Sequence, residues 1–286
     1  MNQVITGGYA PGQGEPWSRD FLRVVSWNIN RGLKFSGILS FLRDAAADLI
    51  LLQEVDLDAR RTHRLDIGRE LAHSLRLNYV FGKEFVELSQ GSQSSPAYHG
   101  AATFSPWPLT AGRTIRFRQQ SSYWRPHWYI PQLDVFQRRL GGRLALASEA
   151  TIYGRRVATH NLHLESKAGD EIRLAQLREV LEDGARQQES GLAIIGGDFN
   201  LDTGRSGADA MLNGAGFHDA VRSPGRPTVP RALFEKGKAI DWIYVSGATG
   251  SHGRVHDRIR ASDHYPVSTE FPLSDGLRAR LQGRRK

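Results

Sequence analysis

The sequence contains no cysteine, and this absence removes several kinds of chemistry at once. Disulfides, thiolate zinc sites and cysteine nucleophiles are excluded, and the redox compartment stays open. No apolar run approaches the length that a membrane-spanning helix needs. Residues 1–20 also lack the apolar stretch that forms the centre of a signal peptide. We therefore expect a soluble, cytoplasmic protein with no zinc site.

The composition that remains is that of a globular protein with an excess of basic residues. Of the 286 residues, 40% are hydrophobic and 24% are charged, which suits a chain with a buried core. The 38 lysines and arginines outnumber the 30 acidic residues and give a net charge of +8. Such an excess favours polyanionic partners, but it can also serve solubility alone.

Strand-like and helix-like segments alternate along the chain, without a short tandem repeat. The pattern predicts a flexible leader at 1–20, one catalytic domain at 21–273 and a basic tail at 274–286. Apolar runs predict strands at 22–27, 48–54, 143–150, 155–164, 192–195, 239–245 and 267–271, with a turn at 153–154 between the third and fourth. Helical spacing predicts helices at 36–48, with Ser36 as N-cap, and at 67–75 and 170–188. Mixed elements over the whole length favour one α/β domain with helices packed on its sheets.

Five polar clusters lie where apolar runs end, at residues 26–30, 53–54, 160–163, 197–200 and 262–264. Strand ends are common places for ligand sites, because the loops there diverge. Residues two apart in a strand share a face, which pairs Asn28 with Asn30, Asn161 with His163, and Asp198 with Asn200. Each cluster alone also fits an ordinary turn or loop. Together, their carboxylates, amides and imidazoles suit a hard divalent cation and a phosphoryl group.

Four further polar residues lead to different expectations. Asp241 lies inside an apolar strand and predicts a charged partner, because burying an unpaired carboxylate costs several kcal/mol. His160 faces away from the rest of its cluster and is expected to be a packed core histidine. His252 and His256 have the spacing of a helical metal pair, but Gly253 interrupts them, so a surface loop is favoured.

The clusters occur in an order that resembles a known family. The matching motifs are Trp-Asn at 27–28, Gln-Glu at 53–54, Asn-Leu-His-Leu-Glu-Ser at 161–166, Gly-Asp-Phe-Asn at 197–200, Ile-Asp-Trp-Ile at 240–243 and Ser-Asp-His at 262–264. Over roughly residues 21–273, this set resembles the endonuclease/exonuclease/phosphatase superfamily. The motif at 161–166, followed by Arg173 and Gln176, is most similar to the tyrosyl-DNA phosphodiesterase and neutral sphingomyelinase branches.

The resemblance implies a fold and a metal-dependent activity. The fold would be a four-layer αββα sandwich, with two packed mixed β-sheets flanked by helices. The activity would be hydrolysis of phosphodiester bonds with Mg²⁺ or Mn²⁺ as cofactor. Glu54 would be the main metal ligand, with Asn28 and Asp263 nearby, since hard cations take oxygen ligands and retain waters.

The resemblance also implies catalytic roles. Asp198 and Asn200 would orient or deprotonate the attacking water and hold the phosphoryl group. His264, paired with Asp241, would act as the base or as a positively charged stabiliser, because the carboxylate fixes its tautomer and raises its pKa. His163 would donate to a phosphate oxygen. Whether Asp198 or His264 takes the proton stays open.

A basic and aromatic segment gives clues to the substrate. Residues 113–143 contain seven arginines and one aspartate, with aromatic residues between them. Arginines neutralise phosphates and aromatic rings stack on bases, although the same residues could simply cover the sandwich. A polar loop is also expected at 90–99. The candidate substrate-binding residues are Asn30, Asn161, Tyr98, His99, Trp124 and Arg125.

The leading functional hypothesis is a metal-dependent phosphodiesterase acting on DNA or RNA, as a nuclease or an end-processing enzyme. A lipid or small-metabolite phosphoesterase is the first alternative, and exposed apolar loops near the site would favour it. A non-catalytic nucleic-acid-binding module is the second alternative. The presence of every proposed catalytic residue argues against that last reading.

Overall fold

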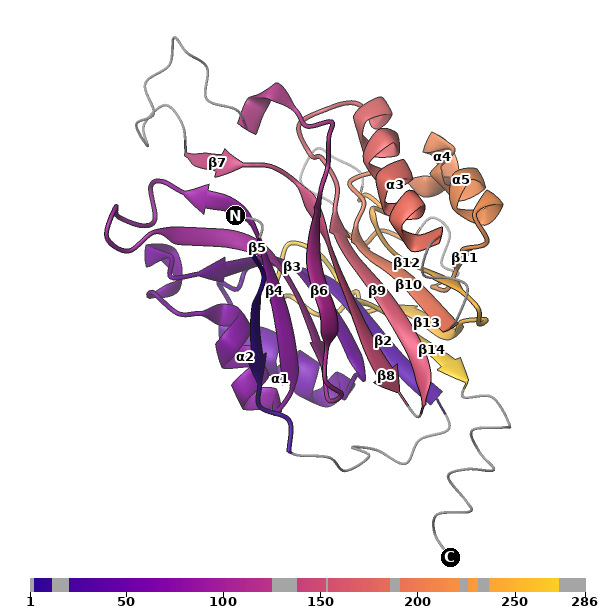
Figure 1. Cartoon of the computed structure of the whole chain (residues 1–286), viewed down its shortest axis with the longest axis horizontal. Helices are drawn as coiled ribbons and strands as arrows, with labels where there is room; N and C mark the ends of the chain where they lie inside the picture. Colours follow the sequence, from indigo (N-terminus) through magenta and orange to yellow (C-terminus); the bar gives the residue numbers. More distant parts are fainter. Residues whose placement is uncertain are drawn as a thin grey trace, which may run out of the picture.

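The protein folds into two mixed β-sheets that pack face to face, with helices on both outer faces (Figure 1). The computed structural model describes residues 3–11, 21–124, 138–152, 154–185, 191–221, 226–230 and 237–272. Among them, no helix is long and apolar enough to cross a membrane.

The first sheet has the order β1-β4-β5-β3-β2-β14-β13, and β7 also pairs with β4. Its strands are β1 Ile5–Gly8, β2 Phe21–Arg31, β3 Leu49–Leu57, β4 Asn78–Glu87, β5 Ala97–Ser105, β7 Arg139–Gly141, β13 Ser251–Val255 and β14 Val267–Pro272. The second sheet has the order β11-β12-β10-β9-β8-β6. Its strands are β6 Thr110–Arg116, β8 Leu144–Ile152, β9 Arg155–His163, β10 Gly191–Asp198, β11 His218–Asp219 and β12 Asp241–Ser246.

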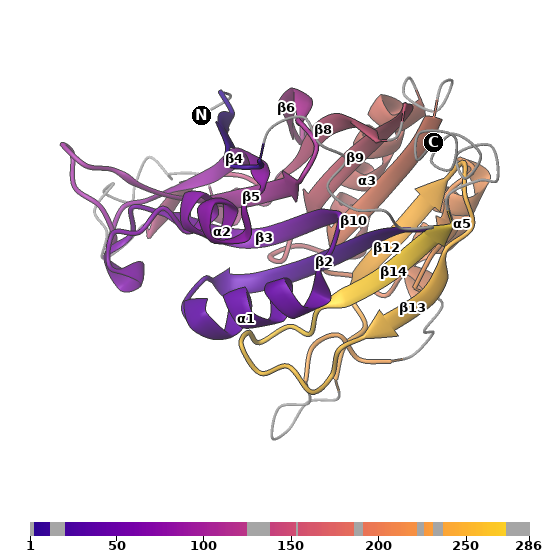
Figure 2. The ribbon, with the colours of Figure 1, turned by 90° about the horizontal axis from the view of Figure 1, so that it is seen from below.

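Alternation along the strands produces the four layers. In β3, Leu49 and Leu51 face the second sheet, whereas Ile50 and Leu52 face the helices. The helices on this side are α1 Phe35–Ala45 and α2 Ile67–Leu75, and Figure 2 shows α1 lying along β2. On the other side α3 Asp170–Ala185, α4 Thr203–Ser206 and α5 Ala208–Gly214 lie over the second sheet, where α3 and α5 close a third apolar core. This confirms the αββα sandwich that the resemblance implies.

The first helix differs from its predicted limits. The N-cap position is Lys34, whose side chain makes no capping hydrogen bond, so the prediction of Ser36 as N-cap is wrong. The helix also ends early, at a left-handed Ala46. It stops there because Asp48 already pairs with β2: its backbone N–H donates to the Arg23 carbonyl and its side chain accepts from the Arg23 N–H.

The expected leader is only partly described, and its residues Ile5–Gly8 form a strand of the first sheet. Ile5 lies opposite Phe81, and β1 pairs with β4 along its whole length. A flexible leader is therefore wrong for Ile5–Gly8. Residues 12–20 and the predicted tail at 274–286 lie outside the described residues. Strands β8 and β9 pair antiparallel up to Ile152 and Arg155, and Tyr153 of the predicted turn lies outside the described residues.

Candidate active site

Three neighbouring strands of the second sheet bring polar side chains into one row. The parallel pairing of β9 and β10 places His163 opposite Asp198, and the antiparallel pairing of β10 and β12 places Asp198 opposite Asp241. Residues opposite each other in a ladder point to the same face of the sheet. All three side chains are buried. The His163 Nε2 atom lies 3.5 Å from the Asp198 Oδ2 atom.

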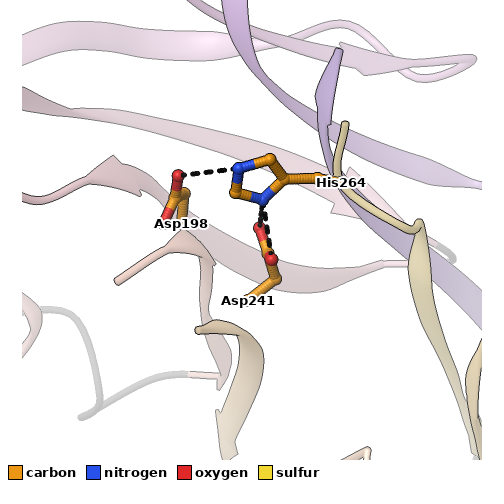
Figure 3. A group of neighbouring side chains, drawn as sticks. All are labelled: Asp198, Asp241 and His264. Atoms are coloured by element: carbon orange, nitrogen blue, oxygen red, sulfur yellow. Dashed lines mark hydrogen bonds and ion pairs between the residues drawn. The ribbon is translucent and has the colours of Figure 1, made fainter. Parts of the chain in front are cut away.

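His264 lies between the two carboxylates of this row (Figure 3). Its Nδ1 atom lies 3.1 and 2.9 Å from the two Asp241 oxygens, and its Nε2 atom lies 3.8 Å from the Asp198 Oδ2 atom. The loop before β14 is fixed by Ser262, whose hydroxyl donates to the Asn28 carbonyl and accepts from the His264 N–H. Asp241 therefore has the charged partner that its place in an apolar strand predicts.

Burial and charge move the pKa values of this group in different directions. Burial would lower the pKa of His264, but the carboxylates of Asp241 and Asp198 raise it to about 10. Burial raises the pKa of Asp198 to about 7, with Asp241 adding to the rise and His264 opposing it. Near neutral pH, His264 is therefore an imidazolium, while Asp198 is close to its midpoint and able to exchange a proton.

Two asparagines orient the Asp198 carboxylate. The Asn28 side-chain amide donates to Oδ2 at 3.1 Å, and the Asn200 backbone N–H donates to Oδ1 at 2.9 Å. The Asn200 amide donates to the Leu164 carbonyl, which ties the end of β10 to the end of β9. Each carboxylate oxygen thus has a donor, which fixes the plane of the group.

Glu54 reaches the site through an irregularity in β3, which runs on to Leu57 and does not end at residue 54 as predicted. The pairing of β3 with β5 shifts between Leu52 and Val55, and Glu54 has a left-handed φ of 53°. Such a bulge re-aims one side chain without ending the strand. Although burial would raise the pKa of Glu54, electrostatic interactions with four neighbouring side chains lower it to about 2, so the carboxylate is anionic. The neighbours are His99, Arg143, Arg31 and His264.

Sequence reasoning missed two residues that contact His163. The Arg143 Nη1 atom lies 2.9 Å from the His163 Nδ1 atom and donates to the Glu84 Oε2 atom at 3.1 Å. Glu84 is a fully buried carboxylate within the apolar strand β4. That placement is the same signal that singled out Asp241, and it was available for Glu84 too. Arg143 had no such signal, because it is one of seven arginines in its segment.

Comparison with known proteins identifies the family of this chain. The family model described as Endonuclease/Exonuclease/phosphatase family matches residues 25–264. The chain belongs to the endonuclease/exonuclease/phosphatase family. No curated protein matched the sequence in a search.

Solved structures of this family share the fold at low identity. An endonuclease/exonuclease/phosphatase from Beutenbergia cavernae DSM 12333 is 19% identical, with a TM-score of 0.63 over 90% of this chain and 72% of that chain. The human Nocturnin catalytic domain with bound sulfate anion is 17% identical, with a TM-score of 0.62 over 96% and 97%. D. rerio TDP2 complexed with single strand DNA product is 19% identical, with a TM-score of 0.58 over 89% and 100%.

The donor atoms of the site fit the divalent cation that this family uses. Asp198, Asp241 and His264 offer ligand atoms within 4.8 Å of one another. Both Asp241 oxygens already contact the His264 ring, however, so a cation bound there would break that pair. Glu54 is anionic and half-buried, and Asp263 is exposed, so both can offer an oxygen to a hard cation.

Asn161 is not placed to bind substrate. Its side-chain amide donates to the carbonyls of Leu52 and Ala102 at 3.0 and 2.9 Å, and its oxygen accepts from Gln53 at 2.7 Å. The side chain is completely buried between the two sheets. The structure therefore corrects the substrate-binding assignment and makes Asn161 a polar link between the sheets.

The other candidate substrate-binding residues have varied surroundings. Tyr98 and His99 lie in β5, so the loop expected at 90–99 ends before them. His99 is buried, with its Nδ1 atom 3.0 Å from Asp56, and does not line an open surface. Trp124 is also buried, and its indole N–H donates to Glu165. Tyr98 and Asn30 are half-buried, which leaves them as candidates. Arg125 lies outside the described residues.

The described part of the basic segment is engaged within the protein. Phe117 is buried against α3. Four arginines pair with carboxylates: Arg113 with Asp183, Arg118 with Glu179, Arg139 with Glu87, and Arg143 with Glu84. At these positions the residues cover the sandwich and pair within the protein, and this interpretation is favoured over that of a nucleic-acid surface.

Three further histidines had expectations from the sequence: His160, His252 and His256. His160 is buried, with its Nε2 atom 2.8 Å from Asp183, which confirms a packed core histidine. His252 lies on β13 and its side chain is 79% exposed, while His256 contacts Ser268 at 2.8 Å just after that strand. The expected surface loop is therefore wrong for His252, which lies in a strand, whereas His256 follows the end of that strand.

Proposed function

We propose that the protein is a divalent-metal-dependent phosphodiesterase that acts on nucleic acid. The observation that supports this most is the row of His163, Asp198 and Asp241, closed by His264, together with Glu54 at the irregularity within β3. Such a set can activate a water, stabilise a phosphoryl group and bind a cation. Family membership makes phosphoester hydrolysis the reaction class.

Asp198 is the proposed general base. Its raised pKa of about 7 suits proton transfer near neutral pH, and its two donors aim the carboxylate. Asn200 would complete the orientation of the water. His264 has a pKa too high for a base, so it would instead be the positive charge that stabilises the phosphoryl oxygens.

Glu54 would bind Mg²⁺ or Mn²⁺, with Asn28 and Asp263 as neighbouring ligands. The bound cation would offset negative charge on a non-bridging phosphate oxygen. The depressed pKa of Glu54 keeps this ligand ionised over the whole physiological range. Asn30 and Tyr98, both half-buried, are the proposed substrate contacts among the described residues.

Nucleic acid is proposed as substrate because the chain has a net charge of +8 and shares its fold with a TDP2 that was solved with a single-strand DNA product. A polyanion would bind such a protein with strong salt dependence. Hydrolysis of a lipid or small-metabolite ester is the alternative outcome of the same assay.

The test is a substrate panel with Mg²⁺, Mn²⁺ or chelator, in which Asp198→Asn is the inactive reference. The panel contains single-stranded DNA, duplex DNA, RNA, 5′-tyrosyl DNA, sphingomyelin and bis(p-nitrophenyl) phosphate. We expect turnover of a nucleic acid, loss with chelator, and recovery with Mg²⁺ or Mn²⁺. Cleavage of sphingomyelin or of the small diester alone would contradict the nucleic-acid proposal, and full activity in chelator would contradict the metal.

A further inference from the structure

The His163 imidazole is held by an arginine on one side and faces a carboxylate on the other. The Arg143 Nη1 atom lies 2.9 Å from His163 Nδ1, and Asp198 Oδ2 lies 3.5 Å from His163 Nε2. The His163 and Arg143 side chains are 1% and 3% exposed, so water does not compete for these contacts.

Arg143 is itself fixed from several directions. Its Nη1 atom donates to Glu84 at 3.1 Å, and its Nη2 atom donates to Ser166 at 3.0 Å. Its guanidinium also lies 5.3 and 5.4 Å from the ring centres of Phe85 and Trp124. A guanidinium bound on this many sides has little freedom to leave the His163 ring.

The chemistry of arginine decides which ring nitrogen carries the proton. A guanidinium has only N–H donors and no acceptor, and it is never deprotonated in a protein. The nitrogen that faces it must accept, so Nδ1 is without a hydrogen and Nε2 carries one. The Nε2–H group then points toward the Asp198 carboxylate.

The other charges around His163 agree with a neutral ring. Burial and the positive charge of Arg143 hold the pKa of His163 well below its usual value, and His99, His264 and Arg139 act in the same direction. Two carboxylates oppose this effect: Asp198 lies 3.5 Å from Nε2 and Glu84 lies 3.6 Å from Nδ1. Arg143 is closer to Nδ1 than Glu84 is, and it already pairs with Glu84.

We infer that Arg143 is a positioning residue that fixes His163 as the neutral Nε2–H tautomer, so that His163 donates a hydrogen bond in the site and accepts no proton. The tautomer follows from the contacts of the His163 ring alone. Its consequence for hydrolysis rests on the proposed function, with the Nε2–H group as the donor to a phosphate oxygen.

The tautomer can be tested by nitrogen NMR of the protein labelled with ¹⁵N-histidine, with and without Mg²⁺. A His163→Gln spectrum assigns the signals. Between about pH 5 and pH 8, where an ordinary histidine titrates, we expect a protonated Nε2 and an unprotonated Nδ1. A protonated Nδ1, or a ring that titrates in this range, would overturn the inference.

Three variants separate positioning from simple support of the fold. Arg143→Met removes the donor and leaves Glu84 facing Nδ1, so we expect a proton on Nδ1. Arg143→Lys keeps a donor and should keep the wild-type tautomer. Arg118→Met is the matched control, because the Arg118 side chain is 74% exposed on the surface. If Arg143→Met does not fold, the double variant with Glu84→Gln also removes the buried carboxylate that Arg143 would leave unpaired. The tautomer of the wild-type protein is decided by its own spectrum, whether or not these variants fold.

The activity arm uses bis(p-nitrophenyl) phosphate. We expect kcat to fall about 10²-fold in Arg143→Met with KM little changed, and Arg143→Lys to recover most of it. Equal loss in the lysine variant, with the tautomer retained, would remove the proposed role in hydrolysis. A wild-type protein that shows the tautomer but hydrolyses no phosphoester would defeat the proposed function and leave the tautomer in place.

Discussion

The Asp198 Oδ2 atom and the His264 Nε2 atom lie 3.8 Å apart, but the two groups have different pKa values. Asp198 is buried in the row, where desolvation disfavours its charge, and Asp241 adds like-charge repulsion. His264 faces two carboxylates, and their attraction exceeds its own desolvation. Two groups whose pKa values are moved apart in this way are suited to different roles in acid–base chemistry.

Replacing Asp198 by Asn should abolish activity without destabilising the fold. The raised pKa means that the folded state binds a proton more tightly than the unfolded state, so ionisation costs stability as the pH rises from about 4 to about 7. Asn has no such cost. We expect kcat to fall about 10²–10⁴-fold, and the melting temperature at pH 8 to stay equal or rise. Circular dichroism melts and turnover assays measure both. A large drop in melting temperature would make Asp198 a structural residue.

Replacing Asp241 by Asn should change the pH dependence of the reaction. The carboxylate of Asp241 is the main cause that raises the pKa of His264 to about 10. With an amide there, the imidazolium would lose its proton at a lower pH, and the alkaline limb of the kcat/KM profile would move toward neutral. The profile of the variant, recorded beside the wild type, gives the shift directly. An unmoved alkaline limb would assign that limb to another group.

Between the elements, the contact of α1 with the end of β13 contains a histidine, His256. The His256 ring lies 5.0 Å from the Phe41 ring of α1, and its Nε2 atom contacts Ser268 of β14. Burial, with the positive charges of Arg254 and Arg23, lowers the pKa of His256 to about 4. A neutral histidine is therefore part of the folded contact between these elements.

This contact predicts a loss of stability on acidification. From about pH 6.5 to about pH 4 the unfolded state takes up a proton at His256 and the folded state does not, so stability falls as the pH falls. His256→Gln should weaken this dependence in melts between these pH values. His252→Gln is the control, because the His252 side chain is 79% exposed. Equal slopes in wild type and His256→Gln would contradict a neutral, half-buried His256 in the folded state.

The elements also show which parts of the site the sequence could predict. His163 and Asp198 lie at true strand ends, where alternation and apolar runs are informative. Glu54 does not, because its orientation follows from a left-handed backbone within β3, which no local pattern of side chains indicates. Asn161 shares its strand face with His163 but lies two residues further from the strand end, where the side chain is completely buried. Its contacts therefore follow from its depth between the sheets, which the alternation of faces along the strand does not indicate.

At the scale of the whole molecule, the two sheets are joined near the site by polar contacts as well as by the apolar core. Gln53 of β3 donates to Asn161 of β9, and Asn161 donates back to the carbonyls of Leu52 and Ala102. Leu52 is the residue at which the pairing of β3 with β5 shifts before Glu54. Asn161 therefore connects the second sheet to the bulge that aims Glu54 in the first.

Asn161→Leu should lower stability and activity together. The variant leaves buried polar groups on the first sheet without a partner, and each such group costs about 1–3 kcal/mol. The bulge would also lose its contact with the second sheet, so kcat should fall while KM changes less. Urea unfolding gives the free-energy change, and Asn213→Leu, at an exposed position of α5, should stay within about 0.5 kcal/mol of wild type. If Asn161 bound substrate instead, KM would rise with no loss of stability. The two results differ because a link between sheets acts on every folded molecule, whereas a substrate contact acts only on the complex.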